Sequence, residues 1–409
     1  MLALRFRAYP DEDTASEAWR HIDILRQIRN HAVRDYYSHQ QGNRPTEYSQ
    51  HSKIPEWKRH WPIFKGPSAH AAQQAVSQIH NDLETLKEHR NNGYKTGRLK
   101  WQGRGEFRSI SYNQSNRYDV DHNTGDEDYV RIRLEKIGWI SVRAHRTIPD
   151  ADDIKRVVLK KEVTGDWFVS FIVDSPAFPE KPSPETLDAA DCVGVDLGIL
   201  SYIHTSDDIS VDMLDLSDEY ERYAREQRKL DRKEHGSNNR EKQRRKVATA
   251  KRTIKRKVED FQHKLSTWLV KEYDLVAVED LDVKSMLETS QSAKNKQDAA
   301  WSRFLRLLEY KGELYGTRVV KVDAAGTSKE CSRCGVATSK PVWVREHSCP
   351  ACGHEEDRDL NAAKNILSRG RQKVGAGRSE STPVQTALPV STPVEVDAKR
   401  VVEAGSPEA

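Results

Sequence analysis

The 409-residue sequence lacks any apolar run long enough to span a membrane, and it does not begin with a segment resembling a secretory leader. Its mean hydropathy is −0.83 and 32% of its residues are charged, as is typical of a soluble protein. We therefore expect a cytoplasmic protein with no membrane partner. The length predicts two or three domains, each with enough residues for its own core.

Cysteine is also scarce, and its few occurrences are clustered. Four of the five cysteines fall within 22 residues in the pattern C-x2-C-x14-C-x2-C, formed by Cys331, Cys334, Cys349 and Cys352. Two disulfides or four unrelated thiols are the alternatives, but the lack of a leader argues against an oxidising compartment. Paired C-x-x-C segments favour a tetrahedral sulfur site for one Zn²⁺. Four thiolates close the coordination shell, so this zinc is expected to hold structure and not to catalyse.

The net charge of +4 is too small to indicate a nucleic-acid partner by itself. Its distribution is more informative, because 14 Lys/Arg and only three Asp/Glu lie between Arg228 and Lys257. The segment predicts one or two helices with a break at 236–239. A solvated charged helix is the alternative, but we expect this block to contact phosphate. The candidate contacts are Arg240, Lys242, Arg244, Arg245, Lys246, Lys251 and Arg252.

The first half of the chain alternates between strand and helix patterns. Residues 1–10 have the period of a strand, and two amphipathic helices are expected over 12–37 and 68–90, joined by a polar, proline-containing connection. Four more strands are expected over 130–134, 139–144, 155–161 and 167–173. Short strands with glycine turns predict a small barrel or curled sheet. The basic, aromatic segment 93–108 is compatible with a solvated loop or with nucleic-acid contacts.

Three acidic residues stand where metal sites are commonly built. Asp196 ends an apolar strand and is flanked by Gly194 and Gly198, which would let a metal and a phosphate approach the backbone. Glu279 follows a second buried strand, and Asp357 or Asp359 begins a helix. Each acid alone can be explained as a helix cap or a surface charge. Together they resemble a site in which two Mg²⁺ ions cleave a phosphodiester.

An ordered set of motifs resembles the TnpB family of RNA-guided DNA endonucleases carried by insertion sequences. The set comprises V-G-V-D-L-G, the basic G-S-N-N-R-E-K-Q-R-R-K, V-E-D-L, W-S-R-F-L-R-L-L-E-Y-K, T-S-K-E-C-S-R-C-G, C-P-A-C-G and D-R-D-L-N-A-A-K-N-I. The resemblance implies a catalytic Asp–Glu–Asp triad at Asp196, Glu279 and Asp359. Asp359 is preferred because the family's acid precedes x-N-A-A, and Asp357 is the alternative. Two Mg²⁺ ions, replaceable by Mn²⁺, and one Zn²⁺ are the implied cofactors.

The resemblance also implies a domain order and partners. A RuvC-like nuclease of RNase H fold (α/β), carrying the inserted four-cysteine zinc finger, would follow an oligonucleotide-binding β-barrel with a helical recognition insertion. The expected boundaries are barrel 1–10 and 104–180, helical insertion 11–103, nuclease 190–329 and 354–370 with a basic helical region at 219–268, zinc finger 330–353, and a disordered tail 371–409. The implied partners of a monomeric protein are target double-stranded DNA and a guide RNA transcribed from the same mobile element.

Two other functions are compatible with this pattern. A guide-directed protein that binds DNA without cutting would have lost triad acids, whereas all three candidates are present here. A DNA-joining transposase could use the same acids, but the sequence has no separate helix-turn-helix for binding transposon ends. We therefore expect RNA-guided cleavage.

Overall fold

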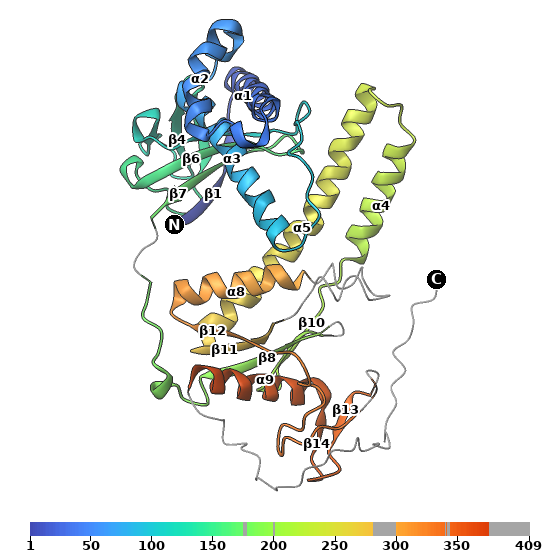
Figure 1. The fold of residues 1–409 in the computed structure, drawn as a ribbon. Coiled ribbons are helices and arrows are strands. Elements are labelled where there is room, and N and C mark those ends of the chain that lie inside the picture. The colour runs from blue at the N-terminus through green and yellow to red at the C-terminus, as the bar shows by residue number, and fades with distance from the viewer. Residues whose placement is uncertain (175–177, 199–200, 281–299, 340, 342–343, 376–409) are drawn as a thin grey trace. The chain divides into compact units, whose positions relative to one another are not determined.

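A computed structural model describes the chain except for residues 175–177, 199–200, 281–299, 340, 342–343 and 376–409 (Figure 1). The chain divides into two compact units. The first contains residues 1–176 and 233–249, and the second contains residues 177–232 and those from 250 onward. None of the described helices is both long enough and apolar enough to cross a membrane.

The first unit is built on a seven-stranded antiparallel sheet with the order β2-β6-β7-β1-β5-β4-β3. Its strands are β1 (Leu2–Tyr9), β2 (Ser109–Tyr112), β3 (Tyr118–Asp121), β4 (Tyr129–Leu134), β5 (Gly138–Arg143), β6 (Ile154–Lys161) and β7 (Trp167–Val173). Side chains join the two edges of this sheet, since the Tyr118 hydroxyl of β3 donates to the Ile154 carbonyl of β6. The Tyr112 hydroxyl of β2 likewise donates to the Glu135 carbonyl, just after β4. The expected curled sheet is therefore confirmed.

Helices α1 (Glu12–Ser38), α2 (Glu47–His60) and α3 (Ala69–Asn91) lie between β1 and β2 in the chain. Helix α1 begins where the Asp11 side chain accepts a hydrogen bond from the Thr14 amide, and its apolar side packs into the same core as the sheet. Helix α2 was not predicted from the sequence, where its residues read as a connection. This helix has Pro55 inside it and buries only Gln50, Ile54 and Trp57, so its apolar signal is short.

The second unit has a five-stranded mixed sheet with the order β10-β9-β8-β11-β12. Its strands are β8 (Cys192–Leu197), β9 (Ser201–Thr205), β10 (Ser210–Asp212), β11 (Leu275–Glu279) and β12 (Arg318–Val322). β8, β11 and β12 are parallel, and every residue of β11 is buried. Residues of α5 (Asn238–Glu272) and α8 (Trp301–Tyr315) pack on one face, and α9 (Arg358–Val374) packs on the other. The unit therefore has helices on both faces of a central sheet (Figure 1).

Two glycines let α9 lie directly on the strands. A Cβ at Gly194 of β8 would be 2.0 Å from the Ala363 carbonyl oxygen, and one at Gly370 of α9 would be 2.4 Å from the Ala277 Cβ of β11. We expected Gly194 and Gly198 to let a metal and a phosphate approach the backbone, and the structure gives each glycine a different steric reason. Gly194 admits a helix, and Gly198 admits the carbonyl oxygen of Ser201, the first residue of β9, which would lie 2.7 Å from an added Cβ.

Several boundaries differ from the sequence expectations. Helix α9 continues to Val374, so residues 371–374 are helical and not part of a tail, while 376–409 lie outside the described residues. The basic region forms α4 (Ser217–Asp231) and α5, but its residues 233–249 belong to the first unit. Along α8, Trp301, Phe304 and Leu308 are buried, whereas Tyr315 is 42% exposed.

The remaining described elements are short. Strands β13 (Glu346–Ser348) and β14 (Glu355–Asp357) form a hairpin just before α9. Single 3₁₀ turns occupy Gln41–Asn43, Pro62–Lys65, Ser115–Arg117, Ala151–Asp153 and Pro184–Thr186.

Candidate functional site

Strand register brings Asp196 and Glu279 to the same edge of the second sheet. β8 and β11 pair in parallel up to Val195 and Val278, and the two acids are the next residues of their strands. Both acids lie two positions after a residue that faces α9, Gly194 in β8 and Ala277 in β11, so both belong to the α9 face. The sequence prediction that these acids lie at strand ends is thus met by the geometry.

The two carboxyl groups are in an environment that disfavours negative charge. Burial raises the pKa of Asp196 well above its usual range, and the nearby charges of Glu279 and Asp359 raise it further. Burial also raises the pKa of Glu279, which is 7% exposed. Arg358 and Arg345 lower the pKa of Asp196 without cancelling these effects. A bound cation is the countercharge that such a group of carboxylates favours.

Glu279 is oriented by Thr327, the first residue of the T-S-K-E-C-S-R-C-G motif, to which the sequence analysis had assigned no role. The Thr327 hydroxyl donates to Oε1 of Glu279 at 2.6 Å, and Thr327 is 3% exposed. This bond lowers the pKa of Glu279 in opposition to burial. Thr327 lies four residues before Cys331, and the motif that contains it does not say what its hydroxyl contacts, so only the three-dimensional structure relates it to Glu279.

The structure separates the environments of the two candidate third acids. Asp357 caps α9, since its side chain accepts hydrogen bonds from the amides of Asp359 and Leu360. Asp359, in the first turn, forms an ion pair with Arg345 and contributes negative charge to the surroundings of Asp196. Asp357 serves as a helix cap, whereas Asp359 is close enough to Asp196 to raise the pKa of that carboxyl. This geometry favours Asp359.

His204 is a further potential ligand at this edge. It pairs with Asp196 across β8 and β9, so the two side chains emerge on the same face of the sheet. A ring nitrogen of His204 and carboxylate oxygens of Asp357 and Asp359 lie within 4.8 Å of one another. His204 also contacts Asp208 at 3.1 Å. A histidine eight residues after an aspartate matches no recognisable motif, so the sequence did not indicate His204. The register of the β8–β9 hairpin places it beside Asp196.

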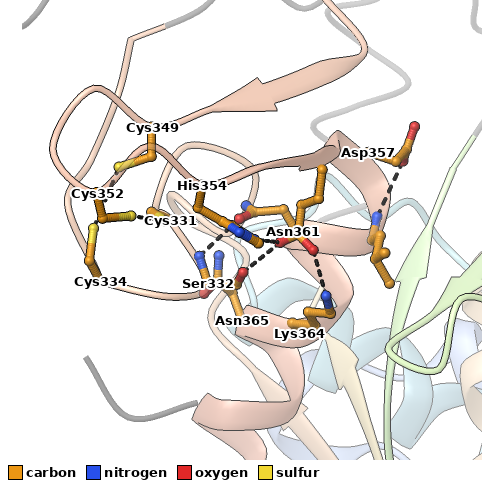
Figure 2. Close-up of polar contacts among 12 residues, drawn as sticks. Cys331, Ser332, Cys334, Cys349, Cys352, His354, Asp357, Asn361, Lys364 and Asn365 are labelled. Atoms are coloured by element: carbon orange, nitrogen blue, oxygen red, sulfur yellow. Dashed lines mark hydrogen bonds and ion pairs between the residues drawn. The ribbon is translucent and has the colours of Figure 1, made fainter. Parts of the chain in front are cut away.

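The four predicted cysteines do come together, on two turns of the same design. Their sulfur atoms all lie within 4.8 Å of one another, with Cys331 to Cys352 at 3.7 Å and Cys334 to Cys349 at 3.5 Å (Figure 2). In each turn the carbonyl of the first cysteine accepts from the amide of a glycine four residues later, Gly335 or Gly353. Both glycines have a positive φ, 76° and 70°. This geometry can hold a tetrahedral metal ion such as zinc.

Two buried asparagines of α9 bind the segment that leads into this cysteine cluster (Figure 2). Asn361 accepts from the Ser332 amide at 2.9 Å and donates to the Glu330 carbonyl at 2.7 Å. Asn365 donates to the carbonyls of Thr327 and Glu330, each at 2.8 Å. The loop 327–332 is therefore fastened to the helix that bears Asp359. The sequence did contain a signal for this contact, because Asn361 and Asn365 are polar residues four positions apart on the apolar side of a predicted helix.

The candidate basic contacts lie on α5. Lys242, Arg244, Arg245, Lys246 and Lys251 are exposed, and Arg240 and Arg252 are half-buried. Within the first unit, burial lowers the pKa values of Arg108 and Lys161. The charge of Arg244 lowers the pKa of Arg108 further, and the charge of Arg245 does the same for Lys161. Arg108, the last residue of the basic, aromatic segment 93–108, and Lys161, which no sequence pattern singled out, therefore lie close to this part of α5. The Lys161 ammonium is 4.7 Å from the centre of the Trp19 ring.

These features define a class: a protein with a helix-flanked α/β sheet, acidic side chains at the strand ends, and a four-cysteine cluster beside them. Two family models match consecutive parts of the second half, "Probable transposase" over residues 173–290 and "Cas12f1-like, TNB domain" over residues 301–366. A Streptomyces pristinaespiralis protein described as "Putative RNA-guided DNA endonuclease" is 32% identical over 90% of this chain and 89% of its own length. The chain belongs to the TnpB family, as its motifs indicated.

Other relatives extend the likeness over nearly the whole chain. "Putative RNA-guided DNA endonuclease InsQ" of Escherichia coli K12 is 27% identical over 92% of this chain and 94% of its own length. Among solved structures, the fold is similar to that in "Cryo-EM structure of the Cas12f1-sgRNA-target DNA complex", with a TM-score of 0.55, 18% identity, and 86% and 82% of the two chains covered. CasPhi-2 (Cas12j) bound to crRNA matches with a TM-score of 0.52, 9% identity, and 93% and 99% covered.

Proposed function

We propose that this chain is an RNA-guided DNA endonuclease encoded by an insertion sequence. The observation that carries the proposal is the meeting of Asp196, Glu279 and Asp359 at one edge of the second sheet, in a chain that is similar over nine-tenths of its length to a described RNA-guided endonuclease. The second unit then acts as the RuvC-like nuclease of RNase H fold, and the first unit as the nucleic-acid-binding barrel with its helical insertion. Base pairing with the guide would select the target, and the protein would read a short flanking motif and cut, as in other guided effectors.

The acidic site fits divalent metal ions. Carboxylate oxygens are the preferred ligands of Mg²⁺ and Mn²⁺, and the raised pKa of Asp196 reflects a negative cluster that a cation would relieve. Asp196, Glu279 and Asp359 would hold the ions, with His204 as an additional ligand. Ions bound there activate water and stabilise the leaving oxygen of a phosphodiester.

The chain's own residues prepare the site. Thr327 fixes Oε1 of Glu279, so the orientation of that carboxylate is set before any ion binds. Arg345 pairs with Asp359 and lies close enough to Asp196 to lower its pKa, which keeps a cationic group beside the reacting phosphate. The N-terminal end of α9 adds positive potential in the same place.

The cysteine cluster is assigned one structural Zn²⁺. Four thiolates leave no open coordination position. Asn361 and Asn365 form a clamp that holds residues 327–330 against α9, so a metal that orders the cysteines would also order the loop that contains Thr327. Zinc would therefore support Glu279 indirectly.

The basic cluster of the first unit is assigned to nucleic-acid backbone. Arg108, Lys161, Arg244 and Arg245 are close enough for like charges to lower the pKa values of Arg108 and Lys161, so an anion would be bound favourably. Guide RNA from the same mobile element and target double-stranded DNA are the proposed partners of a monomeric, cytoplasmic protein.

The test is co-expression of the full chain with its native flanking DNA, followed by sequencing of bound RNA. The purified complex is then given a plasmid library with a randomised flank next to the target, with Asp196→Ala protein run in parallel. A discrete bound RNA and Mg²⁺-dependent cutting that Asp196→Ala loses are the expected results. RNA binding without cutting would indicate a guide-directed DNA-binding regulator, and no bound RNA would overturn the guided mechanism.

A further inference from the structure

A cavity of about 550 Å³ lies in the helical insertion of the first unit, and none of the acidic site residues or cysteines described above lines it. Its walls come from the C-terminal part of α1, the loop after it, the C-terminal part of α3 and the segment 96–98. This volume is within the range of roughly 300–1,000 Å³ that is usual for small-molecule sites. The insertion therefore contains a recess, not merely a convex helical surface.

The cavity wall is strongly cationic. Arg44, Lys87, Arg90 and Arg98 line it, and Glu84 is the one acidic residue among the lining side chains. Within the described residues, none of the four cations forms an ion pair with a carboxylate of the chain. The Arg44 Nε is buried and has no hydrogen-bond partner among the described atoms. Unneutralised cations around a recess favour an anionic ligand.

Two tyrosines add a planar component to the site. The Arg44 guanidinium lies over the Tyr36 and Tyr37 rings, 5.1 Å and 5.4 Å from their centres, and Arg98 lies 5.5 Å from that of Tyr37. The Tyr37 hydroxyl is fixed by the Leu99 amide at 2.9 Å. Guanidinium planes and aromatic rings are both surfaces on which a nucleobase stacks.

We propose that this cavity binds one unpaired nucleotide of a nucleic-acid strand. Arg44, Arg98 and Lys87 would hold its phosphate, and the base would lie against the layer formed by the tyrosines and the guanidinium groups. The inference uses the proposed function only for the nature of the partner, because it concerns binding and not cleavage. Both RNA and DNA offer the required phosphate and base, so the test has an arm for each.

The experiment uses the full-length protein after removal of co-purified nucleic acid. Twelve-residue single strands carrying one photoreactive base, 4-thiouracil in RNA or 5-iodouracil in DNA, are irradiated with the protein, and the attached peptides are identified by mass spectrometry. Attachment within residues 36–44 or 87–98 is expected, and competition by a nucleoside monophosphate should exceed competition by inorganic phosphate. The arm with the stronger attachment identifies the strand. Attachment confined to other segments would overturn the proposal.

A pair of variants gives an independent measurement. Arg44→Gln/Arg98→Gln should weaken single-strand binding at least tenfold and reduce the slope of log affinity against log salt by about 0.7, because one phosphate is no longer neutralised. Arg34→Gln/Arg59→Gln is the matched control, since both arginines are exposed, lie in the same insertion and do not line the cavity. Equal effects of the two double variants would contradict a specific site, with thermal melts showing that both fold.

The two proposals can fail separately. Attachment within the cavity by a protein that cuts no guided target would leave this inference standing and remove the proposed function. If Arg44→Gln/Arg98→Gln protein cuts guided targets and binds nucleic acid with normal affinity, the proposed function stands and this inference is overturned.

Discussion

The Thr327 hydroxyl donates a hydrogen bond of 2.6 Å to Oε1 of Glu279, and both side chains are buried. Thr327 belongs to the loop that runs into Cys331, while Glu279 ends a central strand. This bond is therefore one direct connection between the cysteine-bearing segment and the acidic site, and the ion pair of Arg345 with Asp359 is another.

We predict that Thr327→Val lowers the cleavage rate and raises the Mg²⁺ concentration needed for half-maximal activity, by roughly 10–100-fold together, because Glu279 loses its orienting donor. Thr327→Ser keeps a hydroxyl and should restore most of both quantities. Mg²⁺ titrations of cleavage rate compare the three proteins. Equal behaviour of the valine and serine variants would show that the hydroxyl does not act through the metal site.

The two acids at the start of α9 should separate into different roles. Asp359→Asn should reduce cleavage to background with little change in melting temperature. Asp357→Asn should retain cleavage and cost at most about 0.5–2 kcal/mol of stability, the usual range for changes at a helix N-cap. Melting curves and cleavage assays on both variants decide the matter, and the opposite pattern would make Asp357 the third acid.

Gly194→Ala should destabilise the second unit, since the added Cβ would lie 2.0 Å from the Ala363 carbonyl oxygen. Overpacking of this kind costs about 1–3 kcal/mol, and a backbone obstacle places this case at the upper end. Gly42→Ala is the control, because no atom lies within 4 Å of a Cβ there. Denaturant unfolding measures both, and a neutral Gly194→Ala would mean that α9 can move away from β8 at no cost.

Loss of two assigned zinc ligands should release the metal. Cys331→Ser/Cys334→Ser protein is expected to contain less than one zinc per chain and to lose amide-exchange protection over residues 327–332, which the metal site supports through the asparagine clamp. Cys192→Ser serves as the control, as this buried cysteine contacts the Asp188 carbonyl and not the cluster. Elemental analysis showing undiminished zinc in the double variant would rule out the assigned ligands.

The raised pKa values of Asp196 and Glu279 predict a pH-dependent stability of the metal-free protein. The folded state binds more protons than the unfolded state above the ordinary carboxyl pKa, so stability is greatest below that value and falls as the pH rises through the raised pKa values. Mg²⁺ should therefore stabilise the protein most at the alkaline end.

Melting temperatures measured across the pH range with EDTA or with Mg²⁺ check this expectation. Asp196→Asn should flatten the decline in EDTA, because it removes a carboxyl group whose charge opposes folding. A variant with the same pH dependence as the wild type would place the titrating group elsewhere.

The parts of the molecule that could be predicted are those that depend on residues close together in the sequence. The runs around Asp196 and Glu279 are short and apolar, so both strands could be found, and the cysteine spacing identified the cluster directly. Helix α2 was missed because it contains Pro55 and has too few apolar residues on its buried side to show a helical hydrophobic period.

Contacts between distant segments could not be predicted in this way. His204 reaches the acids only because of hairpin register, and Arg108 meets Arg244 only through the fold of the first unit. Gly194 was recognised as a position of close approach, but nothing in the neighbouring residues says whether a ligand or a helix comes near.

The matching turns at Gly335 and Gly353 have a consequence for the order of metal loading. Each turn sets its own backbone shape within five residues, so either pair of thiols can capture an ion before the other pair is in place. The remaining step closes a loop of 14 intervening residues, and its entropic cost depends only weakly on loop length. Lengthening that loop should thus disfavour completion of the site only slightly, whereas altering both glycines should impair the first capture.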